Sequence, residues 1–185
     1  AHAAGVRAAV HTFSEAAVEI MVRAGVDSVE HGTGLSLDLI DEMARRGTAL
    51  VPTMINIQTF GDIADRAREK FPTYAAHMIA LRDRFPEVVR AAYEAGVPIY
   101  VGTDAGGGIH HGLAADEMLL LHERAGMPAV DVLAAASWRA RQWLGFPGLV
   151  EGGLADLVVY DADPRADLRV VRAPRRIVLR GRVIR

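Results

Sequence analysis

Apolar and polar residues alternate in blocks along the first third of the chain. Three short apolar runs, at residues 6–11, 26–31 and 48–53, have the length and β-branched content of buried strands. Between them, residues 14–23 and 35–46 place apolar side chains at three- and four-residue spacing, and glycine follows each block, as at helix ends. Strands that alternate with helices of about 10 to 12 residues are typical of parallel β/α units. The pattern predicts an α/β fold and argues against an all-β fold or a helical bundle.

A longer helical region interrupts this alternation after Pro52. Residues 55–96 predict two or three helices broken by Pro72 and Pro86. An insertion of this length between strands usually carries function, so we expect it to cap the pocket of the protein. The elements expected after it are a fourth strand at residues 97–102 and helices at residues 113–125 and 129–144.

The pattern changes again after residue 147, where short β-rich segments replace the helices. Residues 155–160 are β-rich, and residues 176–179 and 182–184 flank a tight Arg180-Gly181 turn, which predicts a hairpin. We therefore expect two domains: an α/β unit at residues 1–147 with the helical insertion 55–96, and a small β unit at residues 148–185.

The amino-acid composition excludes several classes of partner and of catalytic chemistry. The 21 basic and 23 acidic side chains give a formal net charge of -2, so we expect neither nucleic acid nor an anionic membrane as a partner. No apolar run has the roughly 18 to 20 residues that a membrane span needs. The absence of cysteine excludes disulfides and thiol catalysis, and it leaves histidine and carboxylate as metal ligands. The chain also opens without methionine, as though it were cut from a longer protein.

Three polar residues stand at or just after the ends of apolar strands: His11, His31 and Asp104. The carboxyl ends of the strands of a parallel barrel share one face, where such side chains converge. Two imidazoles and a carboxylate are the ligand types of a divalent metal site with positions open to water. A hydrogen-bonded structural role is the simpler interpretation of any one of them alone, and the three together favour a site.

The glycine-rich stretch at residues 102–108 (GTDAGGG) allows two other interpretations, an ordinary turn or a phosphate loop. A phosphate loop leads directly into a helix, whereas His110 and His111 intervene here. These two histidines either contact substrate or face solvent. We expect His2, His77 and His122 to be structural or surface residues.

Four stretches, in one order over almost the whole chain, resemble the amidohydrolase superfamily, and specifically its imidazolonepropionase-like and Xaa-Pro dipeptidase-like branch. They are Val10-His11; residues 24–33 (AGVDSVEHGT) running to residues 51–53 (VPT); residues 101–106 (VGTDAG); and residues 152–159 (GGLADLVV) with the trailing residues 180–183 (RGRV).

The resemblance implies a metal-dependent hydrolase with a (β/α)8 TIM barrel and a small β-sandwich beside it. His11 would be the metal ligand on the fifth strand and His31 the ligand on the sixth. Asp104, after the eighth strand, would bind the metal and act as the catalytic group that handles the proton of the attacking water. Zinc is the expected cofactor, with iron or manganese as alternatives. His110, His111 and Thr33 are candidates for contact with a small-molecule substrate.

Two features of the family are missing from this sequence. One is the His-X-His pair on the first barrel strand, and the other is the metal-bridging residue on the fourth strand, which is usually a carboxylated lysine. Lys70 is the only lysine, and its place in the insertion does not suit that role. We therefore expect the chain to be the C-terminal half of a barrel, strands five to eight, with part of the β-sandwich. Its expected partner is the missing N-terminal half of the same protein.

The expected activity is hydrolysis of a C–N bond, in an amide, a cyclic amide or a dipeptide, by metal-activated water. The expected location is the cytoplasm, and the isolated chain is expected to be inactive. The alternative is a truncated or degenerate non-catalytic domain that acts as a binding or assembly module. A third possibility is a homo-oligomer in which two half-barrels close as a dimer.

Overall fold

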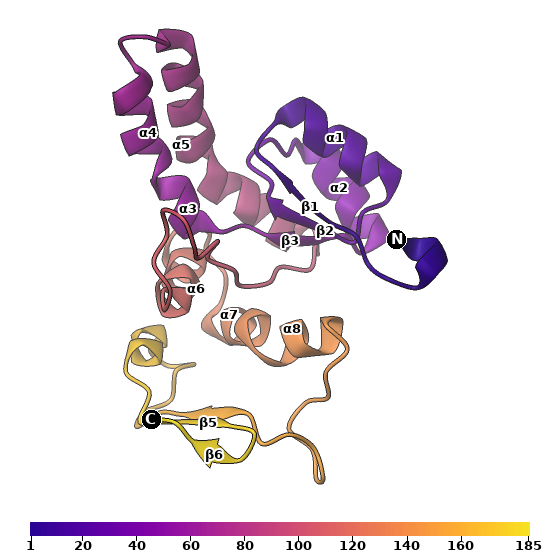
Figure 1. Cartoon of the computed structure of the whole chain (residues 1–185), viewed down its shortest axis with the longest axis vertical. Coiled ribbons are helices and arrows are strands. Elements are labelled where there is room, and N and C mark those ends of the chain that lie inside the picture. Colours follow the sequence, from indigo (N-terminus) through magenta and orange to yellow (C-terminus); the bar gives the residue numbers. More distant parts are fainter.

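The computed structural model describes residues 1–185 and contains two small β-sheets linked by helices (Figure 1). The first sheet is parallel, in the order β1-β2-β3, and pairs Val10 with Val29 and Val29 with Leu50. This confirms the expected α/β fold. The elements of this part are β1 (Ala9–Thr12), α1 (Glu15–Ala24), β2 (Ser28–His31), α2 (Leu37–Arg46) and β3 (Ala49–Val51), preceded by the short 3-10 helix η1 (His2–Ala4).

Local sequence explains both connecting helices. Ser14 and Ser36 cap α1 and α2, because each hydroxyl accepts a hydrogen bond from the backbone N–H three residues further on. Gly25 and Gly47 end the helices in the left-handed conformation, with φ of 85° and 70°. The apolar faces of the two helices are buried in the core; they comprise Val18, Val22, Leu39, Ile40 and Met43.

The expected fourth strand at residues 97–102 is reduced to a single parallel bridge between Ile99 and Leu50, and in this respect the prediction was wrong. Leu50 donates to the carbonyl of Pro98 (2.8 Å) and accepts from the N–H of Tyr100 (3.0 Å). The next bonds of this ladder would need N–H groups from residues 98 and 52, and both are prolines, while Val101 donates to Ala135 on a helix. The segment that leads to Asp104 is therefore attached to the sheet at one point.

The insertion consists of α3 (Met54–Gln58), α4 (Phe60–Ala67) and α5 (Pro72–Glu94). Pro72 opens α5 as expected, but Pro86 lies inside it and does not break it. The helix tolerates the lost hydrogen bond because its second half, with Phe85, Val89 and Ala92, is buried in the core. That half thus covers the sheet as part of the third β/α unit. The first half of α5 packs against α4, and the pair projects from the body (Figure 1).

The remaining helices are α6 (Ala114–Glu123), α7 (Ala129–Ala136) and α8 (Trp138–Trp143). The single helix expected at residues 129–144 is interrupted at Ser137, whose φ of -139° and ψ of -96° are not helical. No proline or glycine marks that break in the sequence. None of the helices in the structure is long and apolar enough to cross a membrane.

The second sheet is antiparallel and contains β4 (Leu157–Val159), β5 (Arg176–Leu179) and β6 (Arg182–Val183). It confirms the expected hairpin, with Arg180 and Gly181 at φ of 50° and 76° in the turn. The 3-10 helix η2 (Leu168–Arg172), which was not expected, packs on α6. The domain boundary at residue 147 falls in the connection between α8 and β4 and stays a prediction.

Candidate functional site

His11 and His31 meet at the carboxyl ends of the neighbouring strands β1 and β2. The distance between Nδ1 of His11 and Nε2 of His31 is 2.7 Å, and the rings are nearly perpendicular. The ring of Phe13 lies against His31 with the centroids 4.4 Å apart. His31 is only 2% exposed, and its φ of 69° is in the left-handed region. The structure therefore brings these two sequence-predicted ligands together.

Thr53, which follows β3, contacts the other nitrogen of the buried histidine. Its Oγ1 lies 2.7 Å from Nδ1 of His31. Two proton arrangements satisfy the chain of contacts with neutral rings. In the first, Nδ1–H of His11 donates to Nε2 of His31, and Nδ1–H of His31 donates to the hydroxyl oxygen of Thr53. In the second, the hydroxyl of Thr53 donates to Nδ1 of His31, and Nε2–H of His31 donates to Nδ1 of His11.

Burial keeps the His31 ring uncharged at neutral pH. The pKa of His31 is lowered to about 4, chiefly by burial; the charge of Asp104 raises this pKa, and His11 lowers it. A neutral imidazole offers a lone pair, which is the form that binds a metal ion.

Asp104 lies apart from the histidine pair. It is exposed and has a φ of 56°, and its Oδ2 accepts a hydrogen bond of 2.8 Å from Nδ2 of Asn56 on α3. No group of three or more histidine, aspartate or glutamate side chains is close enough in the structure to hold a metal ion. The expected convergence of all three residues is thus not seen, because Asp104 follows a segment held by one bridge and its carboxylate is paired with Asn56.

The donor geometry of the histidine pair fits part of a metal site. A tetrahedral zinc with bonds of about 2.0–2.1 Å holds two nitrogens roughly 3.3 Å apart, so the 2.7 Å contact would open by roughly 0.6 Å. The Nδ1 of His31 is already occupied by Thr53, as is usual for the non-ligating nitrogen of a metal-bound histidine. His11 Nδ1 and His31 Nε2 are therefore the atoms that could bind the ion.

Three polar residues near the site were not predicted from the sequence. Glu117 on α6 is fully buried, and its two carboxylate oxygens accept hydrogen bonds of 2.8 Å from the backbone N–H groups of Met54 and Ile55. Asn56 holds Asp104, and Glu30 is a half-buried carboxyl whose pKa is raised chiefly by burial. Only Glu117 left a signal, as an acidic residue followed by the apolar run Met-Leu-Leu-Leu in its helix.

The other candidate residues have different surroundings. His110 and His111 are exposed in the loop before α6, and their contact with substrate stays a prediction. Thr33 is fully buried and its hydroxyl donates to the carbonyl of Phe13 (3.0 Å), which gives it a structural contact in the core. Lys70 is exposed in the connection between α4 and α5.

The histidines expected to be structural or surface groups lie outside the pair. His77 is exposed 3.8 Å from Glu15, and Nδ1 of His122 lies 2.7 Å from the carbonyl of Met127. His2 is exposed beside Asp27.

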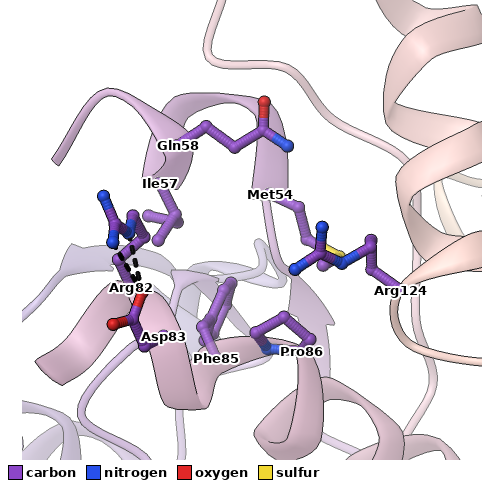
Figure 2. A pocket seen from close by; sticks show the side chains of 8 residues that line it. All are labelled: Met54, Ile57, Gln58, Arg82, Asp83, Phe85, Pro86 and Arg124. Atoms are coloured by element: carbon purple, nitrogen blue, oxygen red, sulfur yellow. Dashed lines mark hydrogen bonds and ion pairs between the residues drawn. The ribbon is translucent and has the colours of Figure 1, made fainter. Parts of the chain in front are cut away.

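A pocket of about 490 Å³ lies beside α3 (Figure 2). Met54, Ile57 and Phe85 supply apolar lining, while Arg82 and Asp83 form an ion pair at its edge. None of the predicted site residues lines it. The insertion begins directly after β3 and contacts Asp104 through Asn56, so its start lies beside the candidate site. That it caps a substrate pocket stays a prediction.

In parallel barrel enzymes the active site lies at the carboxyl ends of the strands, and His11 and His31 lie at the corresponding ends of β1 and β2. The model of the Amidohydrolase family matches residues 1–184, and the chain belongs to that family. A protein of Mycobacterium tuberculosis described as uncharacterized is 52% identical over 182 residues, which are 98% of this chain and 49% of that protein.

Solved structures agree with this membership. A Xaa-Pro dipeptidase with bound methionine in its active site superposes with a TM-score of 0.85 at 28% identity, covering 98% of this chain and 45% of the dipeptidase. The ochratoxinase of Aspergillus niger superposes with a TM-score of 0.81 at 26% identity, covering 97% of this chain and 42% of that enzyme. The chain thus spans about half the length of the relatives it matches.

Proposed function

We propose that the chain supplies part of the active site of a metal-dependent hydrolase that cleaves a C–N bond in an amide, a cyclic amide or a dipeptide. The observation that carries the proposal is the pair of imidazole nitrogens, 2.7 Å apart, at the ends of adjacent parallel strands. Membership of the Amidohydrolase family and likeness to a Xaa-Pro dipeptidase and an ochratoxinase support it.

A divalent ion fits the nitrogen pair, with zinc as the expected metal and iron or manganese as alternatives. His11 Nδ1 and His31 Nε2 would hold it, and Thr53 would accept a hydrogen bond from Nδ1–H of His31. When bound, the ion would polarise the substrate carbonyl and lower the pKa of the attacking water.

Asp104 is suited to move the proton. Asn56 fixes Oδ2 of its carboxylate by a hydrogen bond, while Oδ1 makes no hydrogen bond within the chain and the residue is exposed. The carboxylate would accept a proton from the attacking water and deliver it to the leaving nitrogen. A role as third metal ligand requires its loop to move toward the histidine pair and the hydrogen bond with Asn56 to break.

The remaining ligands would come from residues that precede Ala1 in a longer protein. This part of the proposal rests on the length of the relatives, of which the chain spans about half, and on the absence of a His-X-His pair from its own residues. Such an N-terminal half is the proposed partner, and a homodimer of half-barrels is the alternative source of ligands.

The test replaces Asp104 by Asn in the protein extended to the length of its relatives. The substitution keeps the size of the side chain and removes the base, so turnover of dipeptide and N-acyl amino acid substrates should fall on the order of 10²-fold or more. His122→Ala, whose ring hydrogen-bonds the carbonyl of Met127 outside the candidate site, is the control and should leave turnover unchanged. Near-normal turnover in Asp104→Asn would leave this residue as a turn residue and contradict the mechanism.

A non-catalytic binding or assembly module is the second candidate. The observation that favours it is that only two of the three predicted ligands lie together. It predicts that the extended protein folds and holds no metal, with no metal-dependent turnover of any C–N substrate tested.

A further inference from the structure

The first turn of α3 is capped in an unusual way. The first backbone N–H groups of a helix have no partner within the helix, and the residue before it commonly supplies one through its side chain. Ser14 and Ser36 do so for α1 and α2. Thr53 occupies the same position before α3, but its side chain makes no capping hydrogen bond, since its hydroxyl contacts His31 instead.

Glu117 supplies the missing cap from another helix. Its two carboxylate oxygens accept hydrogen bonds of 2.8 Å from the N–H groups of Met54 and Ile55. The Glu117 side chain has no exposed surface. The contact joins residues 62 and 63 positions apart in the chain. An acidic side chain buried at this point therefore takes over the capping that Thr53 does not provide.

The outer two of the four residues of this turn contact the candidate site, and the inner two are held by Glu117. Thr53 contacts His31, the next two residues are held by the Glu117 carboxylate, and Asn56 holds Asp104. Thr53 is also in the left-handed region, with a φ of 49°, a conformation that a β-branched residue rarely adopts without such support. A shift of this turn would displace both contacts with the site together.

We infer that Glu117 is a positioning residue: its carboxylate fixes the first turn of α3 and thereby sets Thr53 against His31 and Asn56 against Asp104. The inference rests on the proposed function for its consequence in catalysis. Glu117 contacts neither the histidine pair nor Asp104 directly, so it acts through the turn.

The test compares Glu117→Gln with Glu123→Gln, an exposed glutamate at the end of the same helix. Glutamine has the size of glutamate, but only one of its two terminal groups accepts a hydrogen bond, so one of the two N–H groups loses its partner. The measurement is the ¹⁵N spectrum of the His31 imidazole, which reports the proton arrangement on its nitrogens, recorded on the extended protein without added metal at a temperature where it is folded.

Glu117→Gln should shift the His31 nitrogen signals, whereas Glu123→Gln should leave them as in the parent. A double-mutant cycle with Thr53→Ala separates positioning from general destabilisation. In the Thr53→Ala background, where the hydroxyl that transmits the effect is gone, Glu117→Gln should cause no further shift.

Turnover provides the second measurement. With a substrate that the parent hydrolyses, Glu117→Gln should lower kcat on the order of tenfold or more with little change in KM, because a small displacement of reacting groups slows the chemical step. Unshifted His31 signals in folded Glu117→Gln would overturn the inference. If that variant does not fold, the milder Glu117→Asp takes its place, and unshifted signals there count against the inference in the same way.

The outcomes separate this inference from the proposed function. A shifted His31 spectrum in a protein with no metal-dependent turnover would support positioning by Glu117 and contradict the hydrolase. Normal turnover of the parent with an unshifted spectrum in the variant would do the reverse.

Discussion

Glu117 should make the chain less stable as the pH rises through neutrality. Burial raises the pKa of this carboxyl from 4.5 to about 7, although the N–H groups of Ile55 and Met54 act in the opposite direction. Between these two values the folded state holds a proton that the unfolded state has released. The free energy of unfolding therefore falls with increasing pH over this range and levels off above it.

The size of the effect follows from the two pKa values. Their difference, about 7 minus 4.5, at about 1.36 kcal/mol per pKa unit, gives a total loss of roughly 3 kcal/mol. Because the titration is partly complete at pH 5, the loss between pH 5 and pH 8 should be roughly 2–3 kcal/mol.

The assay is urea unfolding of the parent chain and of Glu117→Gln at pH 5 and pH 8. The variant lacks the titrating group. Between pH 5 and pH 8 the free energy of unfolding of the parent should therefore fall by roughly 2–3 kcal/mol more than that of the variant. His31 has the opposite tendency, because its pKa is lowered to about 4 and its contribution rises as the pH increases toward 6.5. Both proteins keep His31 buried, which is the main cause of its lowered pKa, so this contribution largely cancels in the comparison. Equal pH dependence in the two proteins would refute the reasoning.

Three substitutions test the packing that supports the site, each by the same urea measurement. Gly34→Ala should destabilise by about 1–3 kcal/mol or more, because a Cβ there would lie 2.5 Å from the backbone nitrogen of Glu15. Gly108→Ala, where nothing lies within 4 Å, is its control and should be close to neutral. Ser36→Ala should cost about 1 kcal/mol through loss of the α2 cap. Gly102→Ala should displace the Val51 side chain, 2.5 Å from the added Cβ, and destabilise the segment that leads to Asp104.

The first two β/α units could be predicted from the sequence because their signals are local. Serine caps, glycine ends and apolar spacing each act within a few residues, and the structure places β1 to β3, α1 and α2 close to the expected ranges. Where the structure differs from the expected helix and strand boundaries, contacts between residues far apart in the sequence are the cause. Pro86 is accommodated because the helix around it is buried, and the strand at residues 97–102 is shortened because Pro98 and Pro52 lack the N–H groups that would extend its pairing with β3.

The same distinction between local and distant signals applies to the residues of the candidate site. His11 and His31 were identified because the end of a parallel strand defines where a side chain lies. Asn56 and Glu117 were not, because their roles depend on which helix packs against the start of α3, and no local pattern specifies that pairing. Asp104 was recognised by type, but its position depends on the hydrogen bond with Asn56.

The most direct test of the account is the metal content, after dialysis, of the protein extended to the length of its relatives. The parent should retain zinc, iron or manganese in stoichiometric amount, and His11→Ala and His31→Ala should lose it while remaining folded. His77→Ala, whose ring lies 3.8 Å from Glu15 and outside the pair, should retain it. The 185-residue chain alone should hold metal weakly, because its two convergent nitrogens are an incomplete ligand set. Equal metal content in His31→Ala and the parent would contradict the assignment of the histidine pair as metal ligands.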